Sequence, residues 1–195
     1  MATVCSVDSY IHPDLLTKLA TEERILDGEN PYGLVPGEAA SAILVGHGGF
    51  MRGVPPLGQI LRMTEATEPE ELRSLKGIIG RGLASCFRFD EAVPVSRLIA
   101  DLNGERYRAE ELGFAATSAP RRMANLFDDP ETPAANFGDI GAATGGAYAA
   151  LALTPPPRWR VRPVDTMGRE IAVISTSSRT GLRATLVVER SGESA

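Results

Sequence analysis

The alternation of apolar and polar residues divides this chain into short segments, several of which have strand character. A continuous apolar run such as Ala39–Val45 is typical of a buried strand, and Thr180-Gly181 between two apolar runs near the C-terminus predicts a hairpin turn. Gln59 and Arg62 are the polar positions of a further strand. The predicted strands cover Thr3–Tyr10, Ala39–Val45, Leu57–Met63, Val95–Leu102, Ile171–Ser178 and Arg183–Glu189.

Helices are predicted between these strands. The first begins at His12-Pro13-Asp14, because leucines follow there at roughly helical spacing. A second begins at Thr67 as its N-cap, with Pro69 in the first turn, and extends to about Cys86. A third covers Glu105–Phe114, and strands alternating with helices indicate a layered α/β fold. On this third helix we expect a solvated charged face, formed by Glu105, Arg106, Arg108, Glu110 and Glu111.

The segment Phe137–Leu153 consists mainly of alanine and glycine and has no charged face. Glycine inside a helix costs about 1 kcal/mol relative to alanine, so its repeated use indicates that other backbone comes close. Asp139 stands where an acidic residue caps the free N–H groups of a helix start. The segment therefore predicts a buried helix in the middle of the molecule.

Composition restricts the class of protein. A net charge of −5, without any block rich in lysine or arginine, argues against a nucleic-acid-binding surface. No apolar run has the roughly 20 residues needed to cross a bilayer, and the N-terminus lacks the features of a signal peptide. Cys5 and Cys86 form neither a disulfide framework nor a metal-ligand pattern, so we expect two buried thiols in a reducing compartment. These features predict a cytoplasmic protein.

Several phrases of the sequence occur in a characteristic order. VDSYI precedes ENPYGLVPGEAA, in which Pro36-Gly37-Glu38-Ala39-Ala40 is a turn leading into a strand, and DLNGERYRAEE, FGDIGAATGG and STSSRTGLRATLVV follow. In this respect the chain resembles the β-ketoacyl synthases of the thiolase superfamily. The corresponding family patterns are G-E-[AG]-A, an N-A-H-G-T-like turn, G-H-x-x-G-A-A-G and F-G-F-G-G-x-N. The resemblance covers nearly the whole chain.

The resemblance implies a thiolase-like αβαβα layered architecture that is incomplete. Residues 1–50 correspond to the end of the family's N-terminal half and residues 51–195 to its C-terminal half, within a single domain 1–195. The nucleophilic cysteine of the family belongs to a segment upstream of the match at Val7–Tyr10. We therefore expect the catalytic cysteine segment to be absent from this chain.

The two catalytic histidines of the family fall on Asn103 and Asp139. In decarboxylative condensation, as the resemblance implies, two neutral histidines stabilise an enolate and a developing oxyanion. An asparagine N–H still donates a hydrogen bond to an oxyanion, whereas an ionised aspartate opposes negative charge. The structural alternative, which we favour, is that Asp139 caps a helix and that Asn103 forms a turn with Gly104.

The remaining candidate residues are weaker. Cys5 is a nucleophile candidate because TVCSVD resembles the family's T-A-C-S-S stretch, but we favour a buried structural cysteine. His12 and His47 are the only histidines, and since neither aligns with a family histidine we expect solvated loop residues. The resemblance also assigns substrate binding to residues of the same motifs, namely Gly104, Gly138, Gly141 and Ser178.

These departures favour a β-ketoacyl synthase-like protein of fatty-acid or polyketide-type metabolism that is not an independent condensing enzyme. It would be a partner subunit or a truncated form of such an enzyme. One alternative is an active acyltransferase on acyl-CoA or acyl-carrier-protein thioesters that uses Cys5 or Cys86, and another is an acyl-thioester-binding module. We expect no cofactor and no metal. The expected partners are acyl carrier protein or CoA thioesters, together with a second copy or a complete ketosynthase-like chain.

Overall fold

The computed structural model describes most of the chain, and all structural statements below concern these residues. They are residues 1–48, 53, 55–68, 80–88, 93–155 and 169–192.

The larger sheet has four strands in the order β3-β6-β5-β4. Its strands are β3 (Gly58–Thr67), β6 (Leu182–Arg190), β5 (Glu170–Ser177) and β4 (Arg97–Ala100). β5 and β6 form the predicted hairpin, with Gly181 at a positive φ of 103° in the turn. The β3–β6 and β5–β6 pairs are antiparallel and β4–β5 is parallel, so the chain crosses over between β4 and β5.

A second sheet has two antiparallel strands, β1 (Ala2–Ser9) and β2 (Glu38–Val45). Their register runs from Ala2 opposite Val45 to Ser9 opposite Glu38. Helix α1 (Pro13–Thr21) lies between β1 and β2 along the chain. Its N-cap is His12, where the sequence predicts the helix start. We expected residues 39–45 to be a buried strand, but exposed and half-buried positions alternate along β2, so only one of its faces is covered.

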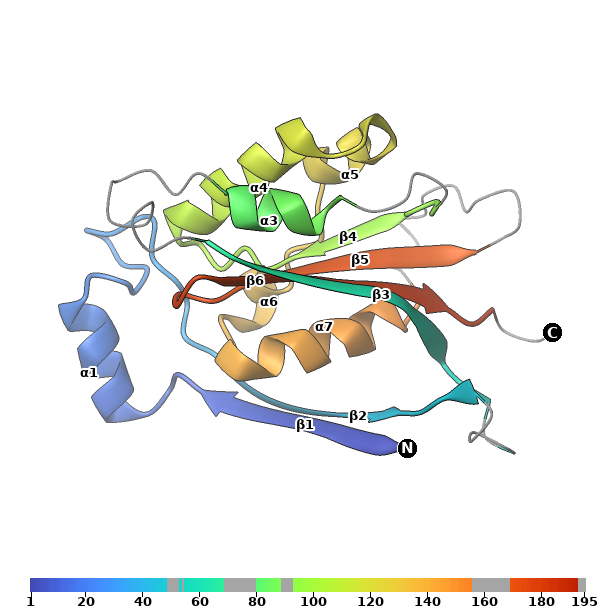
Figure 1. Ribbon diagram of the computed structural model, residues 1–195. Helices are drawn as coiled ribbons and strands as arrows, with labels where there is room; N and C mark the ends of the chain where they lie inside the picture. The colour runs from blue at the N-terminus through green and yellow to red at the C-terminus, as the bar shows by residue number, and fades with distance from the viewer. Residues whose placement is uncertain (49–52, 54, 69–79, 89–92, 156–168, 193–195) are drawn as a thin grey trace.

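The helices form two layers around the larger sheet (Figure 1). One face is covered by α3 (Arg81–Cys86), α4 (Arg106–Ser118) and α5 (Ala124–Asp128), the last preceded by the 3-10 turn η2 (Arg121–Met123). On the other side, α7 (Thr144–Ala152) lies between the larger sheet and the β1–β2 pair. Two short turns lead into α7, namely α6 (Ala134–Phe137) and the 3-10 turn η3 (Gly141–Ala143).

Two apolar clusters lie on opposite faces of the larger sheet. The first fills the space between the sheet and α3, α4 and α5, and includes Phe87, Leu98 and Val187. The second packs α7 against the sheet through Tyr148, Ile99 and Val188. The predicted buried helix of small residues is therefore the element that joins the two sheets, although it begins only at Thr144, after the η3 turn.

One predicted helix start is wrong. Thr67, expected as an N-cap, is the last residue of β3 and pairs with Leu182. The last turn of the predicted helix is present as α3, but it begins after Gly80, whose φ of 64° interrupts helical geometry. Pro69 and the middle of that predicted helix lie outside the described residues.

Candidate functional site

Asn103 and Asp139, the residues on which the sequence resemblance places the family's two histidines, lie side by side. Nδ2 of Asn103 donates a hydrogen bond to Oδ2 of Asp139 over 2.6 Å, and both residues are buried. Asn103 follows β4, and Asp139 precedes the η3 turn that leads into α7. The sequence separates them by 36 positions, so this contact depends on the tertiary fold.

Asp139 binds a free N–H at the start of η3, but the prediction that it is the N-cap is wrong, because the N-cap of η3 is Ile140 and that of α7 is Ala143. Its Oδ1 accepts a hydrogen bond from the backbone N–H of Gly141 at 2.8 Å. Its own backbone is fixed by the segment before β2, because its N–H donates to the Val35 carbonyl and its carbonyl accepts from the Gly37 N–H. Oδ2 of Asp8 on β1 accepts a hydrogen bond from the next free N–H, that of Ala142, at 2.8 Å. Two carboxylates thus occupy the N-terminal end of the η3–α7 segment.

Asn103 has no side-chain hydrogen-bond donor left for a ligand. Its second amide N–H donates to Oε2 of Glu105 at 2.9 Å, and its carbonyl accepts the backbone N–H of Glu105 at 3.0 Å. A side-chain amide offers two donors, and both are used here by carboxylates. The predicted turn at Asn103-Gly104 is present, with Gly104 at a φ of 102°.

Charged residues surround this pair. Arg108 forms an ion pair with Asp101 and lies 3.6 Å from Oδ2 of Asp139. Nε of Arg24 donates to Oε1 of Glu105 at 2.8 Å. We call this group the Asn103 cluster; its members are Arg24, Asp101, Asn103, Glu105, Arg108 and Asp139. All of them are buried except the half-buried Arg24.

Burial and charge act in opposite directions on the acidic groups of the cluster. Burial raises the pKa of Asp101 to about 6, although Arg108 and the backbone N–H of Ser177 act against this rise. Burial also disfavours ionised Glu105, but hydrogen bonds from Arg24 and Asn103 outweigh it and hold the pKa of that carboxyl below its ordinary value. Burial, together with the charge of Asp139, raises the pKa of the nearby Tyr10. The cluster therefore keeps most of its charges through internal pairing.

Both N–H groups of Asn103 are already used within the cluster. An oxyanion or enolate placed here would compete with Asp139 and Glu105 for the Asn103 amide. It would also lie beside the Asp139 carboxylate, whose negative charge opposes its formation. The arrangement is that of a buried polar network that joins β4, α4, η3 and the segment after α1.

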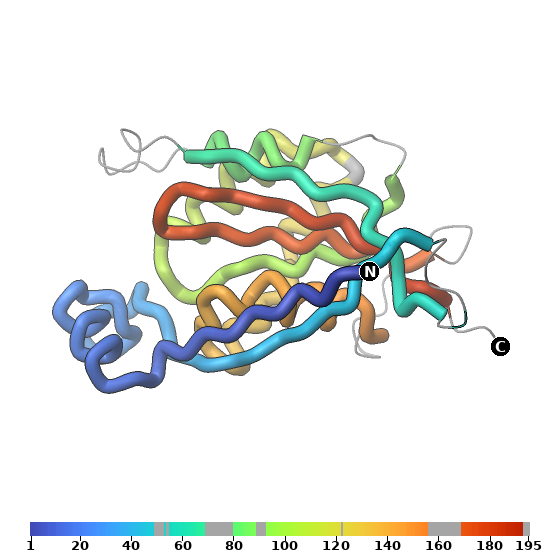
Figure 2. Tube along the Cα trace, turned by 60° about the horizontal axis from the view of Figure 1, so that its bottom comes forward, coloured from blue at the N-terminus to red at the C-terminus, as the bar shows by residue number. Residues whose placement is uncertain are grey.

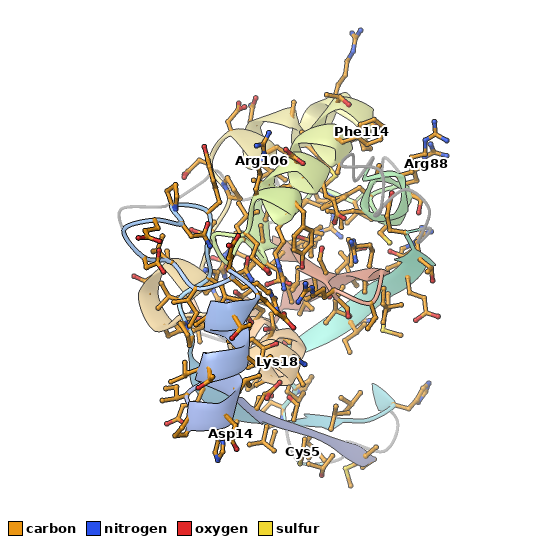
Figure 3. All side chains as sticks on the ribbon, turned by 90° about the vertical axis from the view of Figure 1, so that its left-hand side faces the viewer. Cys5, Asp14, Lys18, Arg88, Arg106 and Phe114 are labelled. Atoms are coloured by element: carbon orange, nitrogen blue, oxygen red, sulfur yellow. The ribbon has the colours of Figure 1, made fainter. Side chains whose placement is uncertain are left out.

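Neither cysteine belongs to this cluster. Cys5 is exposed on β1, so the expectation of a buried structural cysteine is wrong for this residue. Figure 3 shows Cys5 far from Arg106, which begins α4 beside the cluster. Cys86 is buried as expected, with its Sγ 3.6 Å from the carbonyl of Arg183. His12 and His47 are both exposed.

The four predicted substrate-binding residues lie in turns or at the ends of short helices. Gly104, Gly138 and Gly141 all have positive φ angles. A Cβ on Gly104 would meet the Gly33 carbonyl, one on Gly138 would meet the carbonyls of Val35 and Pro36, and one on Gly141 would meet the Asp8 carboxylate. Ser178 lies in the β5–β6 turn, where its Oγ is 2.8 Å from Oγ1 of Thr180. Their role in substrate binding stays a prediction.

The prediction of a solvated charged face on α4 is only partly correct. Of the residues expected on a solvated face, Arg106 and Glu110 are exposed and form a salt bridge, but Arg108 and Glu111 are buried, as is Glu105 just before the helix. Their spacing contains the signal, because buried residues recur there at helical intervals: Arg108, Glu111, Leu112 and Ala115. Each buried charge has a partner outside the helix, on a strand or in a loop.

Within the described part of the chain, no helix is both long and apolar enough for a membrane span. The same residues contain no group of three or more histidine, cysteine, aspartate or glutamate side chains arranged to hold a metal ion.

Among known proteins, the chain is similar to solved structures of ketosynthases. No protein-family model matches the sequence, and no curated protein is significantly similar to it. Among solved structures, the ketosynthase from module 6 of the bacillaene synthase of Bacillus subtilis 168 has a TM-score of 0.69 at 15% identity, over 98% of this chain. The ishigamide ketosynthase/chain length factor has a TM-score of 0.66 at 18% identity, over 97% of this chain. An oxazolomycin ketosynthase domain of Streptomyces albus JA3453 has a TM-score of 0.67 at 15% identity, over the whole chain.

These similarities cover only part of the related structures. The match spans 42% of the bacillaene and oxazolomycin chains and 49% of the ishigamide chain. At this level of identity the similarity establishes the fold and not the activity. It confirms the fold class expected from the sequence motifs: this chain has the thiolase-like fold of ketosynthase domains and spans less than half the length of these relatives.

Proposed function

We propose that this chain is a ketosynthase-like protein of fatty-acid or polyketide-type metabolism that does not itself catalyse condensation. The observation that carries the proposal is the saturated amide of Asn103, which gives both N–H groups to the carboxylates of Asp139 and Glu105. A condensing site needs free donors at these two positions, aimed at the oxygen that becomes negative. Here the same positions stabilise the fold.

The cysteines support the same conclusion. Burial raises the pKa of the Cys86 thiol, which keeps it protonated and poorly nucleophilic at neutral pH. Cys5 is exposed on β1, without the cluster's donors beside it. No observation favours the alternative acyltransferase that would use one of these thiols, or the plain acyl-thioester-binding module.

The proposed role is that of a partner subunit. A second, ketosynthase-like chain would supply the nucleophilic cysteine and the part of the fold that this chain does not span. Acyl carrier protein or CoA thioesters would be substrates of the assembled complex, which we place in the cytoplasm. A truncated form of a condensing enzyme would share the same incomplete site.

The test is a condensation assay on the purified chain, using an acyl thioester and a malonyl thioester of acyl carrier protein. Mass spectrometry follows both the condensed product and any acyl group attached to Cys5 or Cys86. We expect neither a condensed product nor an acyl adduct above the amount found in a control reaction without protein. A condensed product would overturn the proposal, and so would an adduct that disappears in Cys5→Ala or Cys86→Ala.

A further inference from the structure

Ser177 of β5 joins the Asn103 cluster to a second group of buried charges. Its backbone N–H donates a hydrogen bond to Oδ2 of Asp101 at 3.0 Å, and its Oγ donates to Oε2 of Glu111 at 3.4 Å. Glu111 forms an ion pair with Arg183 of β6. β5 and β6 lie side by side in the larger sheet, between β3 and β4 (Figure 2). One polar network therefore extends from the cluster to the centre of the sheet, on the face that α4 covers.

Glu68 adds a further carboxylate to this network. It directly follows β3 and is fully buried. Its Oε2 accepts the backbone N–H of Gly82 at 2.6 Å, whereas Oε1 has no hydrogen-bond partner among the described residues. The charge of Glu68 acts on Glu111, whose two carboxylate oxygens are bound by Arg183. Two buried carboxylates thus lie close together at a single guanidinium.

Acidic groups outnumber basic groups in the network. We call it the α4 network; among the described residues its carboxylates are Glu68, Asp101, Glu105, Glu111 and Asp139, and its guanidiniums are Arg24, Arg108 and Arg183. All of them are buried except the half-buried Arg24. If every group is ionised, two negative charges have no counter-charge within the network. A buried carboxylate in that position is neutralised most simply by a proton.

Asp101 and Glu111 are the two carboxyls best placed to bind the proton. Asp101 is surrounded by polar and charged groups of α4, β5, α7 and the segment before η3, namely Tyr107, Arg108, Ser177, Tyr148 and Asp139. Glu111 is surrounded by such groups of β5, β6 and the end of β3, namely Ser177, Arg183 and Glu68. Burial raises the pKa of Asp101 to about 6 and also raises that of Glu111. Both carboxyls lie where α4 meets the larger sheet.

We propose that α4 is held on the larger sheet by a proton-dependent contact, which is tight while the α4 network binds a proton and loosens when that proton passes to water at higher pH. Arg108 and Glu111 belong to α4, whereas Asp101 and Arg183 belong to the sheet side. Deprotonation therefore adds negative charge across the α4–sheet contact. Movement of α4 away from the sheet relieves the repulsion, because water then reaches the carboxylates. The inference does not depend on the proposed function.

Hydrogen exchange on the purified chain tests the proposal. Mass spectrometry measures the amide protection of α4 at pH 5 and pH 7.5, with correction for the intrinsic pH dependence of exchange. β2 is the internal control, because the α4 network has no member on that strand.

We expect the protection of α4 to fall about tenfold between pH 5 and pH 7.5. This is the change that results from one carboxyl with a pKa of about 6 in the folded state and 3.8 ordinarily. The folded state binds the proton more tightly, so the contact is favoured at low pH and weakens as the pH rises through 6. Unchanged protection of α4, or an equal loss in β2, would overturn the inference.

Two variants identify the group that binds the proton. Asp101→Asn should remove most of the pH effect, because an amide does not titrate in this range. Glu110→Gln is the matched control, since Glu110 is an exposed carboxylate of the same helix that pairs with Arg106 outside the network. It should keep the tenfold change. Equal behaviour of the two variants would contradict a role for the network.

Proton release on unfolding requires no variant. Urea unfolding of the wild type at pH 6, in weakly buffered solution with an indicator dye, should release about half a proton per chain or more. The reason is that Asp101 is half protonated at this pH in the folded state and almost fully ionised in the unfolded state. Net proton uptake, or no release at all, would overturn the inference even if Asp101→Asn did not fold.

Discussion

Arg183 and Glu111 form a fully buried, bidentate ion pair that joins β6 to α4. Nε of Arg183 donates to Oε2 of Glu111 at 2.6 Å, and Nη2 donates to the other carboxylate oxygen. Both side chains are removed from solvent. Burial raises the pKa of Glu111, and the charge of the buried Glu68 adds to this rise. Glu68 also accepts a hydrogen bond from the backbone N–H of Gly82 at 2.6 Å. The pair anchors the helical layer to the larger sheet.

Glu111→Leu should destabilise the chain by about 3–5 kcal/mol, because it leaves the Arg183 guanidinium buried without a counter-charge. The double variant Glu111→Leu/Arg183→Met should recover most of this loss, since both charges are then replaced by apolar groups of similar size. Urea denaturation monitored by circular dichroism measures both values. An additive loss in the double variant would contradict the view that the pair behaves as one unit.

Asn103→Asp should be more destabilising than Asn103→Ala. Alanine removes the N–H groups that donate hydrogen bonds to the carboxylates of Asp139 and Glu105, at a cost of about 1–3 kcal/mol. Aspartate removes the same donors and adds a third carboxylate between them, so like charges repel in a buried site. Thermal or urea unfolding at neutral pH ranks the two variants. Equal stability of Asn103→Ala and the wild type would show that the amide does not hold the cluster together.

The stability of the chain should contain a pH-dependent contribution from Asp101. Its pKa is about 6 in the folded chain and 3.8 ordinarily, so the folded state binds the proton more tightly. Ionised Asp101 therefore carries a cost that is fully present above pH 6 and is lost as the pH falls toward 3.8. The cost amounts to about 3 kcal/mol, from roughly 1.4 kcal/mol per pKa unit.

This contribution is isolated by comparing the wild type with Asp101→Asn. As the pH is lowered from 6.5 to 4, the free energy of unfolding of the wild type should rise relative to that of the asparagine variant. This change is expected whichever of the two proteins is more stable at neutral pH. Glu105 titrates in both proteins with its lowered pKa, so its opposite effect cancels in the difference. Parallel stability curves over this range would contradict the raised pKa of Asp101.

Two glycines near the start of α7 should respond in opposite ways to alanine. Gly141 has a φ of 53°, and a Cβ there would meet the Asp8 carboxylate. Gly141→Ala should therefore lose at least about 1–2 kcal/mol from the backbone conformation alone. Gly145 lies inside α7 with open space around its Cβ position, so Gly145→Ala should gain up to about 1 kcal/mol. Melting temperatures of the two variants provide the measurement, and equal shifts would contradict it.

The order of strands and helices could be predicted from local patterns. The hairpin at Thr180-Gly181, the helix start at His12 and the strand at residues 97–100 each depend on neighbouring residues. The sequence resemblance singles out Asn103 and Asp139, and the structure brings their side chains within 2.6 Å of each other. These features are the ones that a local pattern or a motif specifies.

The charged cluster could not be predicted in the same way. Arg108 and Glu111 look like surface residues because their ordinary environment is water. Their partners lie outside the helix: Asp101 directly follows β4, and Arg183 lies on β6. Cys5 was misplaced for the related reason that β1 leaves its residues exposed where an apolar pattern suggests burial. Both errors arise where tertiary contacts, and not local propensity, determine the environment.

The strand order also governs when the larger sheet can form during synthesis. β3 begins at Gly58, but its neighbour in the sheet is β6, which ends at Arg190, close to the C-terminus. The parallel strand β4 likewise pairs with β5, which follows it by about 70 residues. Contacts between residues so distant in sequence form slowly and only when both strands have left the ribosome. A nascent chain therefore exposes the apolar residues of β3 until β6 has been synthesised, and we expect the larger sheet to form only from that point on.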